Sequence, residues 1–283
     1  AMEDCLMPYI DNLAGAIRAA VWSRGVSEER TEAAVLSLIV SSLATTSGRL
    51  ISGGYQIMKE MGMKAYRFSL SWARIMPEGT GAVNEKGLEY YDNLINELLD
   101  NGIEPFVTLY HWDLPYALHL QGGWMNPNSP SWFYEYAKVV AEHFSDRVKN
   151  FFTINEPQCI VGLGYQTGEH APGLKVGPSD YFRIWHNVLK AHGRAVEALR
   201  EFSKQPVKIS MAPCGALYVP ETNKPEDIEA ARKANFSLPE NSIGACSWDV
   251  ALCCDPVYLG QYPEDILKEF GQFFPKVTDA DMK

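Results

Sequence analysis

The sequence contains no long hydrophobic run and no basic N-terminal start. Its best apolar stretch, residues 33–43, is interrupted by three serines and falls short of the roughly 18 residues that a membrane helix needs. Glu3 and Asp4 stand where a secretory signal would carry positive charge. We therefore expect a protein with no membrane partner and no secretory signal.

Positive charge is also scarce, since 25 Lys and Arg stand against 35 Asp and Glu and give a net charge of −10. A surface of this sign repels nucleic acids and anionic membranes, so neither is expected as a partner. No glycine-rich phosphate loop follows a predicted strand, because Gly162, Gly164 and Gly168 have the wrong spacing for one. The sequence therefore predicts no nucleotide and no other cofactor.

Cysteines are few and scattered, at positions 5, 159, 214, 246, 253 and 254. Their spacing matches neither a disulfide framework nor a metal site, so no metal is expected. A strained vicinal disulfide between Cys253 and Cys254 is one interpretation, and buried free thiols are the favoured one. Free thiols fit a reducing compartment, and we expect the protein in the cytoplasm.

From about residue 51 the chain alternates short β-branched or aromatic runs with longer helical patterns. The runs predict buried strands at residues 64–71, 104–110, 150–155 and 207–212. Between them, apolar residues recur at helical spacing over residues 88–98, 133–144 and 185–199. This repetition predicts an α/β fold with parallel strands and right-handed crossovers.

Polar and aromatic residues follow three successive predicted strands. Trp72 and Arg74 follow the first, residues 111–113 (His-Trp-Asp) the second, and residues 156–157 (Glu-Pro) the third. A doubly wound sheet concentrates ligands at one crevice, whereas a βα barrel places them after many strands. The distribution favours a barrel with its site at the carboxyl ends of the strands.

The segment TINEPQ at residues 153–158 places an amide and a carboxylate at the end of a predicted strand. A carboxyl group partly withdrawn from water holds its proton more readily and can serve as a general acid near neutral pH. Asn155 could then hydrogen-bond a sugar hydroxyl beside the acid Glu156. The alternative is that Glu156 only caps the helix that follows.

Two further segments carry candidate binding groups. In TLYHWDLP, His111 offers a hydrogen-bond donor and Trp112 a flat apolar face for a sugar ring, although Asp113 before Pro115 is also a common helix entry. In YRFSLSWARIMPEG, Arg67 lies inside a strand. A buried arginine needs a partner, for which we expect a carboxylate in a site or in a structural salt bridge.

Longer blocks containing these segments stand in a fixed order: YRFSLSWARIMPEGTGAVNEKGLEYYDNLI, EPFVTLYHWDLP, GGWMNP, FFTINEPQCIVGLGYQTGEHAPG and DPVYLGQYP. Over residues 55–283 they resemble the retaining β-glucosidases of glycoside hydrolase family 1, in the branch that acts on unphosphorylated glucosides. The resemblance implies an incomplete TIM (β/α)₈ barrel holding about strands 2 to 5. It also implies a carbohydrate partner, namely β-linked glucosides or short oligosaccharides.

The resemblance assigns a role to each candidate residue. Glu156 takes the place of the general acid/base, and Arg67 that of the residue orienting the nucleophile. Asn155, His111 and Trp112 match positions that line the subsite for the sugar ring.

The sequence departs from the family at both ends. The family's first strand bears a sugar-binding Gln whose surroundings are missing from residues 1–50, and Tyr55-Gln56 leads into a helix pattern instead. The nucleophile belongs to a Thr-Glu-Asn-Gly motif that these residues lack, and Glu240-Asn241 is only superficially similar.

We therefore predict two parts: a divergent, mainly helical segment at residues 1–50 and a partial barrel at residues 51–283. The interpretation is a truncated β-glucosidase-type chain that is weakly active or inactive alone. The rival is a non-catalytic half-barrel that binds sugar or is completed by another chain. Exposed strand edges favour self-association or such a complementing chain.

Overall fold

The computed structural model describes residues 54–55, 57–215, 218–238 and 242–282. The predicted N-terminal segment and its boundary at residue 50, as well as Gln56, Glu240 and Asn241, lie outside them. The chain divides into two compact units, residues 1–66 with 92–104 and residues 67–91 with 105–283. All five candidate site residues belong to the second unit.

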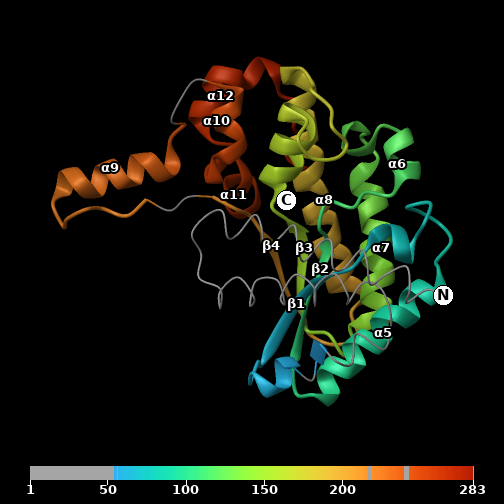
Figure 1. Ribbon diagram of the computed structural model, residues 1–283. Helices are drawn as coiled ribbons and strands as arrows, with labels where there is room; N and C mark the ends of the chain where they lie inside the picture. The colour runs from blue at the N-terminus through green and yellow to red at the C-terminus, as the bar shows by residue number, and fades with distance from the viewer. Residues whose placement is uncertain (1–53, 56, 216–217, 239–241, 283) are drawn as a thin grey trace, which may run out of the picture. The chain divides into compact units, whose positions relative to one another are not determined.

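The described residues form a four-stranded sheet in the order β1-β2-β3-β4, which is also the order along the chain (Figure 1). Strands β2 (Glu104–Tyr110), β3 (Asn150–Asn155) and β4 (Lys208–Ala212) pair in parallel. Strand β1 (Ala65–Ser69) stands at one end of the sheet, and the N–H of Leu70, the residue that follows it, donates to the Thr108 carbonyl of β2. The predicted strands and the α/β class are confirmed.

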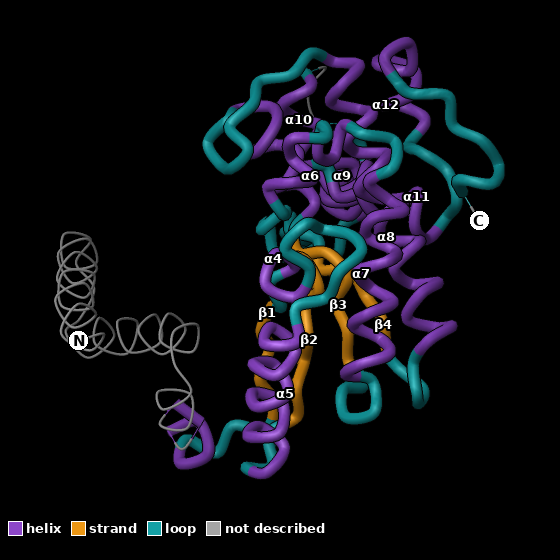
Figure 2. Tube along the Cα trace, turned by 90° about the vertical axis from the view of Figure 1, so that its right-hand side faces the viewer, coloured by secondary structure: helices purple, strands orange, loops and turns teal. Residues whose placement is uncertain are grey.

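Long helices connect the strands, as the apolar spacing predicted. They are α5 (Glu85–Asp100), α7 (Ser129–Phe144) and α8 (Pro178–Phe202). Helices α7 and α8 pack against each other, and α8 also contacts β3 and β4 (Figure 2). Their inward faces carry large buried side chains, among them Phe133, Tyr136, Phe182 and Trp185. Burial of a side chain of this size contributes about 1.5–3 kcal/mol, so this layer stabilises the sheet from one side.

Shorter elements complete the chain. They are α4 (Trp72–Ile75), α6 (Tyr116–Leu120), η1 (Gly123–Met125), the π-helix η2 (Cys159–Thr167), α9 (Pro225–Phe236), α10 (Ile243–Trp248), α11 (Val250–Tyr258), α12 (Glu264–Phe270) and η3 (Gly271–Phe273). None of the helices in the described ranges is both long and apolar enough to cross a membrane. The five described cysteines are free thiols, as expected for Cys253 and Cys254.

In the smaller unit, the rings of Tyr55 and Tyr66 meet edge to face with centroids 6.4 Å apart. Gly102, the expected end of the helix over residues 88–98, has φ of 72° and lies two residues after α5. Only glycine adopts this left-handed conformation without strain, which explains why the helix ends there.

One polar pair is buried between the sheet and its covering helices. The Thr153 hydroxyl of β3 lies 2.7 Å from Nδ1 of His192 in α8, and both side chains are buried. Burial, assisted by the charge of Arg200, lowers the pKa of His192 to about 4. The imidazole is therefore neutral at physiological pH, and its hydrogen bond with Thr153 joins the helix to the sheet.

This pair predicts how stability depends on pH. Because the pKa of His192 falls from 6.5 to about 4 on folding, the unfolded chain binds a proton more readily than the folded chain. The free energy of unfolding should therefore decrease as the pH drops from about 6.5 to about 4, by about 3 kcal/mol. Urea unfolding should show this loss in the wild type and in the control His119→Gln, but not in His192→Gln. Equal pH slopes in all three proteins would contradict the assignment.

Candidate active site

The candidate residues come together around the carboxyl ends of β2 and β3, where Arg67 of β1 reaches Asn155. Arg67 lies in β1, His111 and Trp112 directly follow β2, Asn155 ends β3, and Glu156 is the next residue. Parallel pairing brings these ends to the same edge of the sheet. Residues that lie up to 89 positions apart in the sequence thereby become neighbours.

Asn155 is the centre of the arrangement and is buried. Arg67 Nη2 donates to Asn155 Oδ1 at 2.6 Å, and Asn155 Nδ2 lies 3.2 Å from His111 Nε2. Trp112 Nε1 donates to the backbone carbonyl of Asn155 at 2.9 Å. One residue therefore orients groups from two neighbouring segments.

The bond from Arg67 also determines the state of His111. A guanidinium can only donate, so the atom of Asn155 that faces Arg67 is the carbonyl oxygen, and the amide NH₂ faces His111. His111 Nε2 then accepts from this NH₂, which places the proton of the neutral ring on Nδ1. Partial withdrawal of the ring from water and the charge of Arg67 lower the pKa of His111, whereas the charge of Glu156 raises it. The Nδ1–H remains as the donor that the sequence predicted.

Arg67 differs from the sequence prediction. We expected a buried arginine with a carboxylate partner, but its side chain is exposed. Its direct partners are Asn155 and the Thr108 hydroxyl, which accepts from Nε at 2.9 Å. The guanidinium also lies 4.5 Å above the ring centre of Phe152. The reason for the exposure is that β1 has only one neighbouring strand in the described sheet, so its outer surface meets solvent.

Two of the site residues have strained backbones. Trp112 has φ of 81° and Glu156 has φ of 42°, and they are the only non-glycine residues with positive φ in the described ranges. A side chain in this region costs of order 1–3 kcal/mol and persists only where the surroundings hold it. Hydrogen bonds hold both residues here: Trp112 Nε1 donates to the backbone carbonyl of Asn155, and the Glu156 N–H donates to the Ala212 carbonyl of β4 at 2.8 Å.

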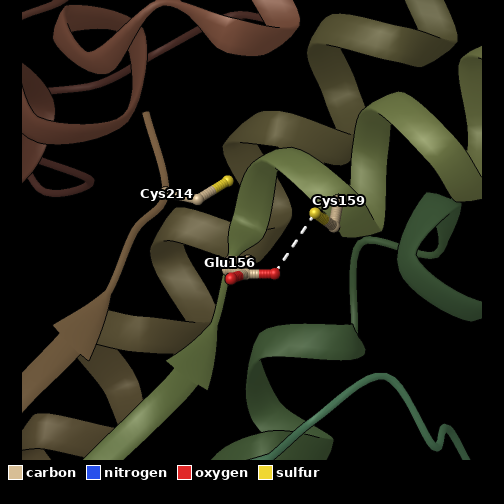
Figure 3. Close-up of side chains that lie close together, drawn as sticks. All are labelled: Glu156, Cys159 and Cys214. Carbon is tan, nitrogen blue, oxygen red and sulfur yellow. Dashed lines mark hydrogen bonds between the residues drawn. The ribbon is translucent and has the colours of Figure 1, made fainter. Parts of the chain in front are cut away.

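The carboxylate of Glu156 is partly buried and faces the start of η2 (Figure 3). Its Oε2 accepts a hydrogen bond from Cys159 Sγ at 3.3 Å. Burial, together with this hydrogen bond, raises the pKa of Cys159 to about 12, so the thiol keeps its proton. The backbone carbonyl of Glu156 accepts from the N–H of Cys159, as in a helix start. The backbone carbonyl of Glu156 therefore takes part in the start of the helix, whereas its side chain does not cap the helix and contacts Cys159 instead.

A cavity of about 350 Å³ lies beside Trp112. Its size falls in the range of small-molecule sites. The ring of Trp112 contacts those of His111 and His170, with centroids 4.8 and 5.0 Å away. The other lining residues include Tyr110, Cys159, Ile160, Tyr165 and Pro172. Aromatic walls beside a few polar groups suit the flat faces of a sugar ring.

Sequence reasoning missed three residues that contact the site. Thr108 holds Arg67, His170 packs on Trp112, and Cys214 lies near Glu156. A signal for Cys214 was present, because it follows β4 by two residues, just as the other site residues follow β2 and β3. No sequence signal pointed to His170, which reaches Trp112 only through the course of the loop after η2.

Known proteins of one family are similar to this chain in sequence. The model of glycosyl hydrolase family 1 matches residues 40–283. Beta-glucosidase A of Thermotoga maritima is 45% identical over 229 residues, covering 80% of this chain and 48% of that protein. Beta-glucosidase 40 of Arabidopsis thaliana is 41% identical over 240 residues, covering 80% of this chain and 45% of that protein. The chain thus spans about half the length of the curated relatives it matches.

The solved structures agree with the sequence comparison. The beta-glucosidase from Thermotoga maritima in complex with glucoimidazole superposes with a TM-score of 0.70 at 43% identity, covering 82% of this chain and 50% of that chain. This likeness and the parallel strands confirm the predicted fold, part of a (β/α)₈ barrel. The family match begins at residue 40, before the blocks that carried the resemblance.

The electrostatics of the site predict opposite shifts in two variants. Removing the positive charge in Arg67→Met should raise the pKa of His111, and removing the negative charge in Glu156→Gln should lower it further, because the two charges act in opposite directions. Proton NMR titration of the ring resonances measures both shifts, with His119 as the internal control. A shift of the same sign in both variants would contradict the described geometry.

Proposed function

The chain belongs to glycosyl hydrolase family 1, and from this premise we propose that it supplies the acid/base half of a retaining β-glucosidase site. The proposed substrates are β-linked glucosides or short β-linked oligosaccharides. The proposal rests on the hydrogen bonds of Asn155 with Arg67 and His111, which lie directly beside the carboxylate of Glu156. Two relatives named as beta-glucosidases support the choice of sugar.

Glu156 is the proposed proton donor. It protonates the glycosidic oxygen as the bond to the sugar breaks, and its carboxylate then takes a proton from the water that releases the sugar. General acid–base help of this kind contributes about 10²–10⁴-fold to the rate. Glu156 is only partly buried, and its hydrogen-bond partner Cys159 lines the cavity beside Trp112.

Three groups are proposed to bind the sugar ring. Asn155 uses one lone pair for Arg67 and one N–H for His111, so one further N–H and one lone pair remain for hydroxyl groups. His111 offers Nδ1–H as a donor, and Trp112 offers an apolar ring face. Bonds to sugar hydroxyls that strengthen in the transition state contribute to catalysis as well as binding.

A retaining mechanism needs a second carboxylate about 5–5.5 Å from the first. The family resemblance places it in a Thr-Glu-Asn-Gly motif, which the 283 residues do not contain. Arg67 is proposed to orient this nucleophile, since its guanidinium has donors beyond those used for Asn155 and Thr108. In this proposal the chain supplies the acid and the sugar contacts, and another segment or another chain supplies the opposing carboxylate.

We also propose a cytoplasmic location and an association through the sheet. The five described free cysteines support a reducing compartment. Strands β1 and β4 stand at the two ends of the described sheet, and unpaired strand edges promote pairing with another chain. A second copy or a complementing chain is the proposed partner.

The first test is the activity of the 283-residue chain itself. Without a nucleophile opposite Glu156, the oxocarbenium-like transition state lacks its stabilising charge and no covalent intermediate forms. A preparation shown by intact mass to contain only this chain should therefore turn over 4-nitrophenyl β-glucoside at least about 10³-fold more slowly than an ordinary β-glucosidase. Ordinary turnover that is lost in Glu156→Ala would mean that another carboxylate, Glu240 foremost, acts as nucleophile. Light scattering on the same sample reports self-association.

The second test addresses Glu156 in any preparation, the chain or a complex containing it, that hydrolyses β-glucosides. Cellobiose has a poor leaving group that needs protonation, so Glu156→Gln should lower its kcat/KM by about 10²–10⁴-fold. Aryl glucosides with good leaving groups need little protonation and should lose less in the first step. The matched control is Glu169→Gln, which changes an exposed carboxylate close in sequence.

An unchanged rate for cellobiose in Glu156→Gln would contradict the acid/base assignment. Binding of glucosides without hydrolysis in every preparation would favour the non-catalytic sugar-binding module instead.

A further inference from the structure

A cluster of three side chains beside the candidate active site has ligand atoms for a metal ion. The carboxylate of Glu156 and the thiols of Cys159 and Cys214 all lie within 4.8 Å of one another. They come from the end of β3, the start of η2 and the segment after β4, and Figure 3 shows them close together. The sequence predicted no metal site because residues 159 and 214 lie 55 positions apart.

We propose that Glu156, Cys159 and Cys214 bind a thiophilic divalent cation, with Zn²⁺ as the physiological ion. Zn²⁺ accepts cysteine sulfur and carboxylate oxygen and prefers a tetrahedral arrangement. Bond lengths of about 2.3 Å to sulfur and 2.0–2.2 Å to oxygen place tetrahedral neighbours roughly 3.5–3.8 Å apart. The 3.3 Å between Cys159 Sγ and Glu156 Oε2 is close to this spacing. Small side-chain rotations complete the geometry, and the fourth position is left for water or a ligand.

Hydrogen bonds fix the backbone of all three ligand residues before any ion binds. The side chain of Gln158, which is fully buried, makes two hydrogen bonds to the backbone of Cys214: Nε2 donates to the carbonyl at 2.7 Å and Oε1 accepts from the N–H at 3.3 Å. The N–H of Cys159 donates to the Glu156 carbonyl, and the N–H of Glu156 donates to Ala212. Such fixed surroundings reduce the ordering cost of binding.

The charges of the site also match a divalent cation. The ion displaces the protons of both thiols, which leave to the solvent, so the three ligands carry three negative charges. The cation contributes two positive charges, and Arg67, which interacts electrostatically with Glu156, contributes a third. Hard cations such as Mg²⁺ prefer oxygen ligands and should not compete for this site.

A bound ion would occupy the carboxylate proposed as the proton donor, so it would act as an inhibitor of that step. This consequence rests on the proposed function, whereas the binding itself does not. The experiment therefore measures binding directly.

The test is a titration of the reduced chain with Zn²⁺ in competition with a chromophoric chelator, and with Cd²⁺, whose thiolate complexes absorb in the ultraviolet. We expect about one ion per chain, an absorption corresponding to two cadmium–thiolate bonds, and no competition by excess Mg²⁺. Cys159→Ser and Cys214→Ser should each weaken binding at least about tenfold and halve the cadmium–thiolate absorption. Gln158→Leu, which removes no ligand, should weaken binding by about 10–100-fold, as loss of supporting contacts does at other metal sites.

The matched control is Cys254→Ser, because Cys254 is a half-buried thiol like Cys214 but lies outside the cluster. It should bind Zn²⁺ as the wild type does. Absence of Zn²⁺ binding to the wild type, or a loss in Cys254→Ser as large as in Cys214→Ser, would overturn the proposal. Circular dichroism confirms that each variant is folded.

Discussion

The hydrogen bonds of Asn155 are the constraint on which the candidate site depends. Its side chain binds Arg67 on one side and His111 on the other, and its carbonyl accepts from Trp112. A single buried residue thereby determines where the guanidinium of Arg67 lies, which ring nitrogen of His111 carries the proton, and how the indole of Trp112 is oriented. Glu156 follows directly in the chain, so the position of the carboxylate depends on the same residue.

The parallel sheet makes these contacts possible and also accounts for the strained backbone of Trp112 and Glu156. Each strand ends at the same edge, and the chain must turn sharply there to enter the next helix. Trp112 and Glu156 make this turn with positive φ, and hydrogen bonds to Asn155 and Ala212 hold them in it. Strained residues held by the surrounding structure are typical of functional sites. The turn after β3 brings Cys159 next to Glu156, and the pairing of β3 with β4 brings Cys214 there, so a metal site and a catalytic acid would share one carboxylate.

Much of the fold could be predicted because it depends on local patterns. The runs at residues 104–110 and 150–155 form strands with the predicted bounds, since buried parallel strands are continuous apolar runs. The site residues after β2 and β3 could be found from their place in the sequence. The exposure of Arg67 could not be predicted from the sequence, because it depends on how many strands flank β1. The cluster with Cys214 depends on the pairing of β3 with β4, which spacing along the chain does not reveal.

The role of Asn155 can be measured through the calorimetric affinity for glucoimidazole, a compound seen bound to the Thermotoga maritima enzyme. The account predicts measurable binding to this chain and a loss of at least about tenfold in Asn155→Ala, because that change removes hydroxyl contacts and releases His111. Asn101→Ala, which changes an amide directly after α5 that donates to Glu97, should bind as the wild type does. Equal affinity in the Asn155 variant, or no binding to the wild type, would contradict the account.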